Sequence, residues 1–413
     1  MKAIVVGGGV VGTACAYQLL GVADEVVLID AGGVGLGATA GNAGWVTPTL
    51  GMPLASPGIL TQGLRSAFDR DGALIIRPSL DPQWARWLWR FARKSRQVEF
   101  ERGMAALMAI TLRSLDALDA MRADGVEFEE HKAGLLVTAF DREGVHWFDA
   151  TFDALRNLGF PGGMTPMSGD EARALEPALG PRIGYAVRTE VDRHVDPTGL
   201  VNGLAEVVRQ RGGTVIEHAP AKAIRRISGG YAVDGPQGEI ARGDVVVLSS
   251  ALGTPELIRP YGLRLPMVGA KGYSVTVSQP TPAPTLPLYL CECKLGTSSI
   301  AGGLRIAGFF ELGSDDPAAS PARADQLLRE TQEYLAGPLD PTPVEGSAGW
   351  AGFRPATPDS LPLLGPVPGA PGLFLATGHG MLGVTLAPAT GVAIAALVRG
   401  ERPAWIAPFA PDR

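Results

Sequence analysis

The stretch Lys2-Ala-Ile-Val-Val-Gly7-Gly-Gly9-Val-Val-Gly12 decides the fold that we expect for the whole chain. Its apolar start predicts a buried parallel strand, and its glycines follow that strand at Gly-x-Gly-x-x-Gly spacing. A helical pattern comes next, and a second apolar run then ends on Asp30, about twenty residues past the glycines. A strand, a glycine turn, a helix and an acid in this order predict a Rossmann-like α/β domain.

Each part of this motif suits the binding of a dinucleotide. The first glycine permits a tight turn, the second lets a pyrophosphate touch bare backbone, and the third lets the helix lie close to the strand. The helix N-terminus points unpaired N–H groups at the phosphates, and the acid accepts hydrogen bonds from a ribose. The alternative is a glycine-rich turn in another kind of α/β domain. We predict dinucleotide contacts from Gly7, Gly9, Val10, Val11, Gly12, Asp30 and Ala31.

Small residues continue after the acid and suggest a second contact with the same ligand. The run Ala38-Thr39-Ala-Gly-Asn42-Ala43-Gly44 has little side-chain bulk, so its backbone could approach a flat ligand closely. A flexible surface loop is the alternative, because glycine-rich segments are also typical of loops. We favour ligand contact because the run follows the nucleotide-binding acid so directly.

The amino-acid composition excludes several classes of protein. The chain has 413 residues, of which 46% are hydrophobic and 19% are charged, so it can bury a large core. Its net charge of −6 and its lack of a basic block argue against nucleic acid as a partner. The three cysteines, Cys15, Cys291 and Cys293, show no metal-ligand spacing, so we expect neither a metal site nor a disulfide framework.

The sequence predicts a soluble, cytoplasmic protein. The first strand begins at Lys2, which leaves no room for a signal peptide, and no uninterrupted apolar run reaches the roughly 18 residues of a membrane-spanning helix. A predicted helix at 84–96 nevertheless carries four aromatic and five cationic side chains. This helix could lie on an anionic membrane surface, or it could be an ordinary packed helix whose arginines reach solvent.

The rest of the chain alternates between two patterns. Residues 82–122 predict two helices, and residues 195–251 return to a strand and helix pattern, so the nucleotide-binding domain resumes after an insertion. Residues 262–345 alternate in the manner of antiparallel strands. The tail contains the segment Gly-Phe-Arg354-Pro and a glycine-rich loop at 378–383, which precedes an apolar helix.

These motifs, in this order, resemble the flavin-dependent D-amino-acid oxidase superfamily over nearly the whole chain. The segments that carry the resemblance are Gly7–Gly12 with Asp30, Ala38–Gly44, Lys271-Gly-Tyr273-Ser, Gly352-Phe-Arg354-Pro and Thr377–Gly383. Within the superfamily the chain is most similar to the small subunits of bacterial D-amino-acid dehydrogenases. It departs from the family at Ser249-Ser-Ala251, where an Ala-x-Gly turn is usual, and at Trp45, where a polar residue is common.

The resemblance implies an FAD cofactor, bound non-covalently because no cysteine occupies a linking position. It also implies a Rossmann-like FAD-binding domain that is discontinuous in sequence, and an α+β substrate domain built on an antiparallel sheet. We assign residues 1–50, 190–260 and 346–413 to the FAD-binding domain, and residues 51–189 and 261–345 to the substrate-binding domain. Further FAD contacts are expected from Ala38, Thr39, Asn42, Ala43, Gly44, Ala221, Gly378, His379, Gly380, Met381, Leu382 and Gly383.

The catalytic candidates are Arg354, Tyr273 and His379. Arg354 is expected to hold the substrate carboxylate, because a guanidinium grips a carboxylate with two hydrogen bonds. Tyr273 could bond the same carboxylate or lie in the core, and His379 could contact flavin or substrate or be structural. Trp45 is a candidate for the substrate pocket. The loop at 378–383 begins an apolar helix, so it is expected to stabilise negative charge on the reduced flavin.

The expected reaction is the oxidation of a D-amino acid by hydride transfer to flavin, giving an imino acid that water hydrolyses to a 2-oxo acid and ammonia. A quinone or another carrier is expected to take the electrons, which would suit peripheral contact with the inner membrane. Three alternatives stay open. The first is a dehydrogenase of a cyclic or N-substituted amino acid such as cis-4-hydroxy-D-proline, the second is a glycine-oxidase-like enzyme, and the third is a non-catalytic FAD-binding subunit.

Overall fold

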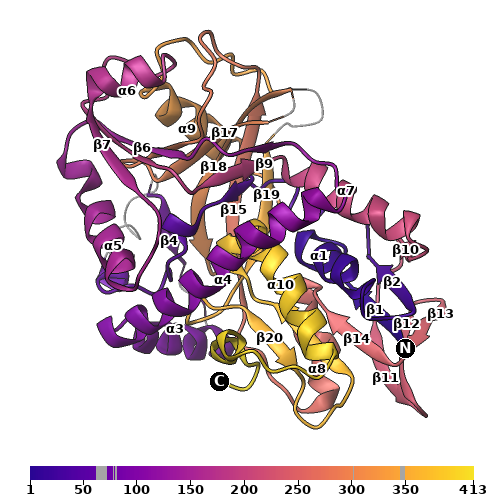
Figure 1. Ribbon diagram of the computed structural model, residues 1–413. Helices are drawn as coiled ribbons and strands as arrows, with labels where there is room; N and C mark the ends of the chain where they lie inside the picture. The colour runs from indigo at the N-terminus through magenta and orange to yellow at the C-terminus, as the bar shows by residue number, and fades with distance from the viewer. Residues whose placement is uncertain (62–71, 78, 80, 301, 345–348) are drawn as a thin grey trace.

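The computed structural model contains two large β-sheets with helices packed around them (Figure 1). One sheet is mostly parallel and the other is mostly antiparallel. The expectation of a Rossmann-like domain joined to an α+β domain is therefore confirmed. The structure describes residues 1–61, 72–77, 79, 81–300, 302–344 and 349–413.

The first sheet is built around the strand that the glycine motif predicted. Its strands are, in spatial order, β10 (Thr214–Ile216), β2 (Glu25–Ile29), β1 (Lys2–Val6), β14 (Val245–Leu248), β21 (Leu373–Thr377) and β20 (Leu363–Pro366). All neighbouring pairs are parallel except β20 and β21. The chain order reverses between β1 and β14, because β2 lies on one side of β1 and β14 on the other. The carboxyl ends of these two strands therefore form the crevice in which open α/β sheets bind ligands.

Side chains of β1 alternate between two cores on opposite faces of this sheet. Ala3 and Val5 pack with a helical layer, whereas Ile4 and Val6 pack against a small antiparallel sheet. The helical layer contains α1 (Val10–Leu19), α4 (Gln97–Ala123), α7 (Pro197–Gln210) and α10 (Gly383–Val398). The other layer contains β11 (Ala223–Ile227), β12 (Gly230–Gly235), β13 (Gly238–Gly243) and α8 (Thr254–Ile258). Because successive side chains of a strand point to opposite faces, both faces of the sheet are covered, and the domain has three layers.

Helices α1 and α10 lie side by side although they come from opposite ends of the chain (Figure 1). The segment Gly380–Val398, which includes α10, is long and apolar enough to cross a membrane. However, 72% of its apolar window is buried inside the protein, where α10 packs against α1 and α4. Burial of most of an apolar helix is typical of a core helix, so its length and composition are weak evidence for a membrane span.

The second sheet contains nine strands among the described residues. In spatial order they are β19 (Trp350–Ala356), β15 (Val268–Val277), β18 (Gly303–Leu312), β17 (Leu295–Ile300), β16 (Leu288–Leu290), β6 (Leu135–Ala139), β8 (Tyr185–Thr189) and β7 (Met164–Ser168), with β4 (Leu74–Ile76) beside β18. A short third sheet contains β3 (Trp45–Val46), β9 (Arg193–Val195) and β5 (Glu130–His131). The remaining helices are α3 (Pro82–Lys94), α5 (His146–Asn157), α6 (Gly169–Leu175), α9 (Pro321–Gln332), and the 3₁₀ helices η1 (Pro48–Leu50), η2 (Glu143–Val145), η3 (Ala251–Gly253), η4 (Arg259–Tyr261), η5 (Gly380–Leu382) and η6 (Ala404–Phe409).

Two segments lie differently from the domain boundaries that we expected. Strand β19 follows residue 346 but pairs with β15, so it extends the second sheet rather than the first. Helix α4 falls within residues 51–189, yet its buried face, including Leu107 and Ile110, joins the core of the first domain beside α10. Both placements depend on pairing with distant segments, which a local sequence pattern does not reveal.

Candidate active site

A cavity of about 1270 Å³ lies where the carboxyl ends of β1 and β14 face the second sheet. Its lining includes the glycine turn, the small-residue run, the carboxyl-terminal loop, Trp45 and Arg354. Of the residues that the sequence analysis placed in the site, Gly12, Gly44 and Tyr273 do not line the cavity and all the others do. The structure therefore brings together segments that are far apart in the sequence.

The glycine turn has the close contacts that its spacing predicted. Gly7 has a φ of +111°, and a Cβ on Gly7 would lie 2.6 Å from the carbonyl of Ser249 at the end of β14. A Cβ on Gly12 would overlap the Gly7 carbonyl oxygen, so α1 can approach β1 only because this position has no side chain. Val10 and Val11 in the first turn of α1 line the cavity. The helix N-terminus therefore faces the cavity, as a pyrophosphate site requires.

Asp30 is fixed by the backbone beside this turn. Its Oδ2 accepts a hydrogen bond of 2.6 Å from the N–H of Gly8, and its Oδ1 accepts one of 2.8 Å from the N–H of Gly32. Asp30 also lines the cavity, so lone pairs that these bonds leave free can accept hydrogen bonds from a ribose. The carboxylate therefore also holds the glycine turn in place, a role that the sequence motif did not suggest.

The small-residue run is held against both domains. The hydroxyl of Thr39 accepts a hydrogen bond of 3.1 Å from the N–H of Val10. Arg305 of β18 donates from Nη1 to the carbonyl oxygens of Ala40 and Asn42, over 2.7 and 3.0 Å. Burial lowers the pKa of Arg305. The run is therefore a fixed wall of the cavity rather than the flexible loop of the alternative interpretation.

The turn after β14 also lines the cavity. Ser249 Oγ donates to the carbonyl oxygens of Val6 and Gly7, over 3.0 and 3.1 Å, and so ties β14 to the glycine turn. Ala251 has a φ of +47°, in the left-handed region that favours glycine. The departure from the family's Ala-x-Gly turn is therefore accommodated by strained backbone at the cavity wall. Ala221, which precedes β11, lines the cavity too.

The carboxyl-terminal loop brings the start of α10 to the cavity. Residues 378–383 all line it, and α10 begins at Gly383. His379 is buried, and its Nε2 lies 3.0 Å from the hydroxyl oxygen of Thr390. Burial lowers the pKa of His379 to about 3, so its imidazole is neutral at physiological pH. The positive end of the α10 dipole, rather than a histidine charge, is therefore the electrostatic contribution of this loop.

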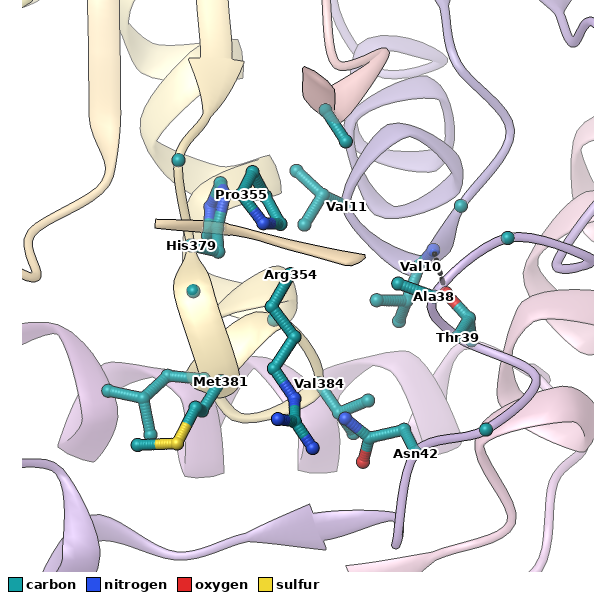
Figure 2. Close-up of a pocket in the computed structure, with 18 of the residues that line it drawn as sticks. Val10, Val11, Ala38, Thr39, Asn42, Arg354, Pro355, His379, Met381 and Val384 are labelled. Atoms are coloured by element: carbon teal, nitrogen blue, oxygen red, sulfur yellow. Dashed lines mark hydrogen bonds between the residues drawn. The ribbon is translucent and has the colours of Figure 1, made fainter. Parts of the chain in front are cut away.

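Arg354 extends from β19 into the cavity, where Figure 2 shows its guanidinium between Asn42 and Met381. Its Nη1 donates a hydrogen bond of 2.8 Å to the carbonyl oxygen of Phe309. Burial lowers the pKa of the guanidinium to about 10, which leaves it charged at physiological pH. No acidic side chain in the described part of the chain pairs with it. A desolvated cation without an acidic partner is unfavourable, so this position suits a ligand carboxylate.

Two backbone features accommodate this guanidinium: one leaves space for it, and the other supplies a hydrogen-bond acceptor. A Cβ on Gly272 of the neighbouring strand β15 would overlap it. Phe309 has a φ of +60°, and the carbonyl that binds Arg354 belongs to this left-handed residue. Strained backbone of this kind is found mainly at functional sites.

Tyr273 lies on the other side of the sheet from Arg354. Side chains alternate along β15, and Arg354 pairs with Ala270 and overhangs Gly272, so Tyr273 points to the opposite face. Its hydroxyl donates a hydrogen bond of 3.0 Å to Glu311, and burial with the nearby Glu311 raises the pKa of Tyr273 to about 12. We therefore do not retain Tyr273 as a substrate contact, because it points away from the Arg354 guanidinium and does not line the cavity.

Trp45 belongs to an aromatic wall that the sequence analysis recognised only in part. Its Nε1 donates a hydrogen bond of 2.7 Å to the hydroxyl of Ser298. Its ring centroid lies 6.1 Å from that of Tyr289, which lies 5.4 Å from that of Trp147. These partners come from segments without a recognisable motif, so no local signal identified them. Further lining residues that the sequence analysis missed include Phe100, Lys222, Glu256, Lys294, Phe309, Phe310 and Trp350.

The residues present fit an FAD molecule. The cavity joins a bare glycine turn, an acid and two helix N-termini to an apolar remainder that suits a flat ring. None of the three cysteines lines it, and burial raises the pKa of Cys291 and Cys293 to about 12, which disfavours reactive thiolates. Within the described residues, no group of three or more His, Cys, Asp or Glu side chains could hold a metal ion.

Comparison with known sequences finds matches over nearly the whole chain. Residues 2–397 match the family model DAO, described as FAD dependent oxidoreductase. The chain is 31% identical to a D-amino acid dehydrogenase of Xanthobacter autotrophicus, in an alignment that covers 98% of this chain and 96% of the relative. It is 32% identical to a D-amino acid dehydrogenase of Paramagnetospirillum magneticum, over 97% of this chain and 96% of the relative.

Solved structures with a similar fold include glycine oxidase from Geobacillus kaustophilus, with a TM-score of 0.77 and 24% identity over 100% of this chain and 99% of that one. L-proline dehydrogenase from P. horikoshii has a TM-score of 0.72 and 17% identity over 99% of this chain and 96% of that one. These likenesses concern the fold. The family model, by contrast, spans nearly the whole sequence, and the chain therefore belongs to the DAO family of FAD-dependent oxidoreductases.

Proposed function

We propose that this protein oxidises a D-amino acid to an imino acid and passes the electrons to a quinone or another carrier. Water then hydrolyses the imino acid to a 2-oxo acid and ammonia. The observation that carries the proposal is the unpaired guanidinium of Arg354, in the same cavity as the nucleotide-binding turn. The activity named for relatives at 31% and 32% identity supports the same reaction.

The side chains of the cavity bind and orient the substrate in this proposal. Arg354 holds the carboxylate with two hydrogen bonds, while the Phe309 carbonyl keeps the guanidinium in place. Bound FAD supplies the chemistry of hydride acceptance from the substrate Cα. The start of α10 at Gly383 favours negative charge that develops nearby. His379 lines the cavity as a neutral group and adds no charge.

Other amino-acid oxidations remain alternatives with the same anchor. An enzyme for a cyclic or N-substituted amino acid, or a glycine-oxidase-like enzyme, would also need Arg354. The fold likeness to glycine oxidase and to L-proline dehydrogenase does not separate them, because both share the whole fold. A non-catalytic FAD-binding subunit is disfavoured, since a protein that only binds FAD has no use for an unpaired guanidinium beside the nucleotide site.

We predict that D-amino acids bleach the flavin of the FAD-loaded enzyme under anaerobic conditions, whereas their L-enantiomers do not. A panel that also contains glycine and cis-4-hydroxy-D-proline separates the enzymatic alternatives. In air, turnover with a quinone analogue should greatly exceed the formation of hydrogen peroxide. Stoichiometric peroxide at a comparable rate would refute the dehydrogenase assignment, and a flavin that no member bleaches would indicate a binding subunit.

We also predict that FAD is bound without a covalent link. Acid precipitation should release all the flavin into the supernatant, and flavin that stays with the precipitate would contradict this. Asp30→Ala removes the carboxylate that fixes the turn, so it should weaken FAD retention by about 1.5–3 kcal/mol, the size of a hydrogen bond to a charged group. Asp170→Ala is the control, because the Asp170 side chain is 94% exposed and lies outside the cavity.

Arg354→Ala should raise the substrate KM and lower kcat while the flavin spectrum stays intact. Removing one partner of a desolvated charge pair typically costs about 2–5 kcal/mol. Arg354→Lys should restore only part of the activity, because an ammonium group cannot reproduce the planar fork. Steady-state kinetics with the best substrate of the panel provide the measurement. Near-normal kinetics in Arg354→Ala would remove this residue from the site.

The aromatic and basic helix α3 has two faces. Trp84, Trp87 and Phe91 are buried and stacked, with successive ring centroids 5.6 and 5.1 Å apart. Trp89 is 57% exposed, and the guanidinium of Arg93 lies 4.8 Å from its ring centroid. Most of the aromatic side chains therefore belong to the core, and the outer face leaves one exposed tryptophan among cationic groups. That face supports a weak, peripheral contact with an anionic membrane from the cytoplasmic side.

We expect weak co-sedimentation with anionic liposomes that high salt abolishes, since each cation near such a surface contributes about 1 kcal/mol. Trp89→Ser should reduce the bound fraction. Leu175→Ser is the control, because Leu175 is another exposed apolar side chain, on α6. Binding that is absent at low salt would show that α3 has only a structural role.

A further inference from the structure

The charged side chains that line the cavity are unevenly distributed. Three of them belong to the first domain: Asp30 at the end of β2, Lys222 just before β11 and Glu256 within α8. Lys294 and Arg354 instead come from the second sheet, just before β17 and within β19. The substrate side of the cavity therefore has two cations and, among the described residues, no carboxylate.

Lys294 differs from most lysines of the chain in lacking a partner. Three of the six lysines form ion pairs with acidic side chains, and Lys271 donates to a backbone carbonyl. The ammonium groups of Lys222 and Lys294 have no hydrogen-bond or ion-pair partner in the described part of the chain, and both line the cavity. The lysines without a protein partner are thus the ones that a ligand could reach.

Lys294 lies in the turn between β16 and β17, the two strands that contain Tyr289 and Gly296. Lys294 has a φ of +56° and directly precedes β17. Gly296, two residues later, lies against Trp45, because a Cβ at Gly296 would be 2.6 Å from that ring. Tyr289 pairs with Gly296 across the two strands, and its ring centroid is 6.1 Å from that of Trp45. Lys294 therefore lines the cavity from the turn that joins the two strands in contact with Trp45.

The ammonium group of Lys294 has access to solvent but no counter-charge from the described part of the protein. Much of the Lys294 side chain is accessible, yet enough protein surrounds it for desolvation to lower its pKa. No neighbouring charge contributes to that shift. A substrate α-carboxylate on Arg354 neutralises only one of the two cations on this side. A second anionic group on the ligand would neutralise the other.

We propose that Lys294 binds a carboxylate on the substrate side chain, so that the preferred substrates are amino acids with an acidic side chain. This inference rests on the proposed function, because it assumes that Arg354 holds the α-carboxylate. The substrate then lies between two cations, and the aromatic wall covers its methylene groups. An amide of the same shape cannot neutralise Lys294, so the site discriminates against it.

The test compares isosteric substrate pairs under anaerobic conditions with the FAD-loaded enzyme. D-glutamate is compared with D-glutamine, and D-aspartate with D-asparagine, through the apparent second-order rate constant of flavin reduction. The unmodified enzyme should favour the acidic member by about tenfold or more, the size of a charge-assisted hydrogen bond. Lys294→Met should bring this ratio close to one, and Lys294→Glu should invert it. Lys132→Met removes a cation from an exposed position outside the cavity and should leave the ratio unchanged.

The outcomes separate this inference from the proposed function. If neutral D-amino acids reduce the flavin but acidic ones are not preferred, the role of Lys294 is overturned and the proposed function stands. If Lys294→Met lowers the rate constants for both members of each pair by the same factor, the residue is structural and the inference is overturned as well. If no D-amino acid reduces the flavin, the proposed function fails and this inference fails with it.

Discussion

An arginine guanidinium without a carboxylate partner is the constraint on which the proposed substrate site depends. Arg354 remains charged although burial lowers its pKa to about 10. The surrounding backbone adapts to it, because Gly272 leaves space for the guanidinium and the left-handed Phe309 supplies a carbonyl. A strand glycine costs about 0.5–1 kcal/mol and a left-handed phenylalanine about 1–3 kcal/mol. Such unfavourable features are retained where a ligand completes the site.

The position of this guanidinium relative to the nucleotide turn is set by bonds that cross between the domains. Arg305 of the second sheet binds carbonyl oxygens in the run at 38–44 of the first domain. Trp45 donates to Ser298 on one side and accepts a hydrogen bond of 2.8 Å from the Thr385 hydroxyl on the other. Since Thr385 belongs to the first turns of α10, the aromatic wall and the helix N-terminus are held together. Orientation of a substrate against a cofactor requires this kind of rigidity.

The parts of the cavity that could be predicted from the sequence are those formed by residues close to one another along the chain. The glycine turn, Asp30 and the loop at 378–383 each combine a strand or helix end with small residues, so their contacts follow from local geometry. Tyr273 shows the limit of this reasoning, because its motif neighbour Gly272 lies against the Arg354 guanidinium and strand alternation turns the tyrosine away. Lys294 could not be found at all, since the pairing of β16 and β17 with distant strands creates its surroundings.

The charges of the cavity also explain how the proposed reaction can proceed without a catalytic base. The substrate amine must be neutral before its Cα–H leaves as a hydride. Arg354 and the N-terminus of α10 both present positive charge to the cavity, while His379 is neutral. A positive environment disfavours the ammonium form of the substrate and so lowers its pKa, whereas it stabilises the carboxylate that anchors it. In the proposed reaction the same positive groups therefore bind the substrate and favour its reactive protonation state.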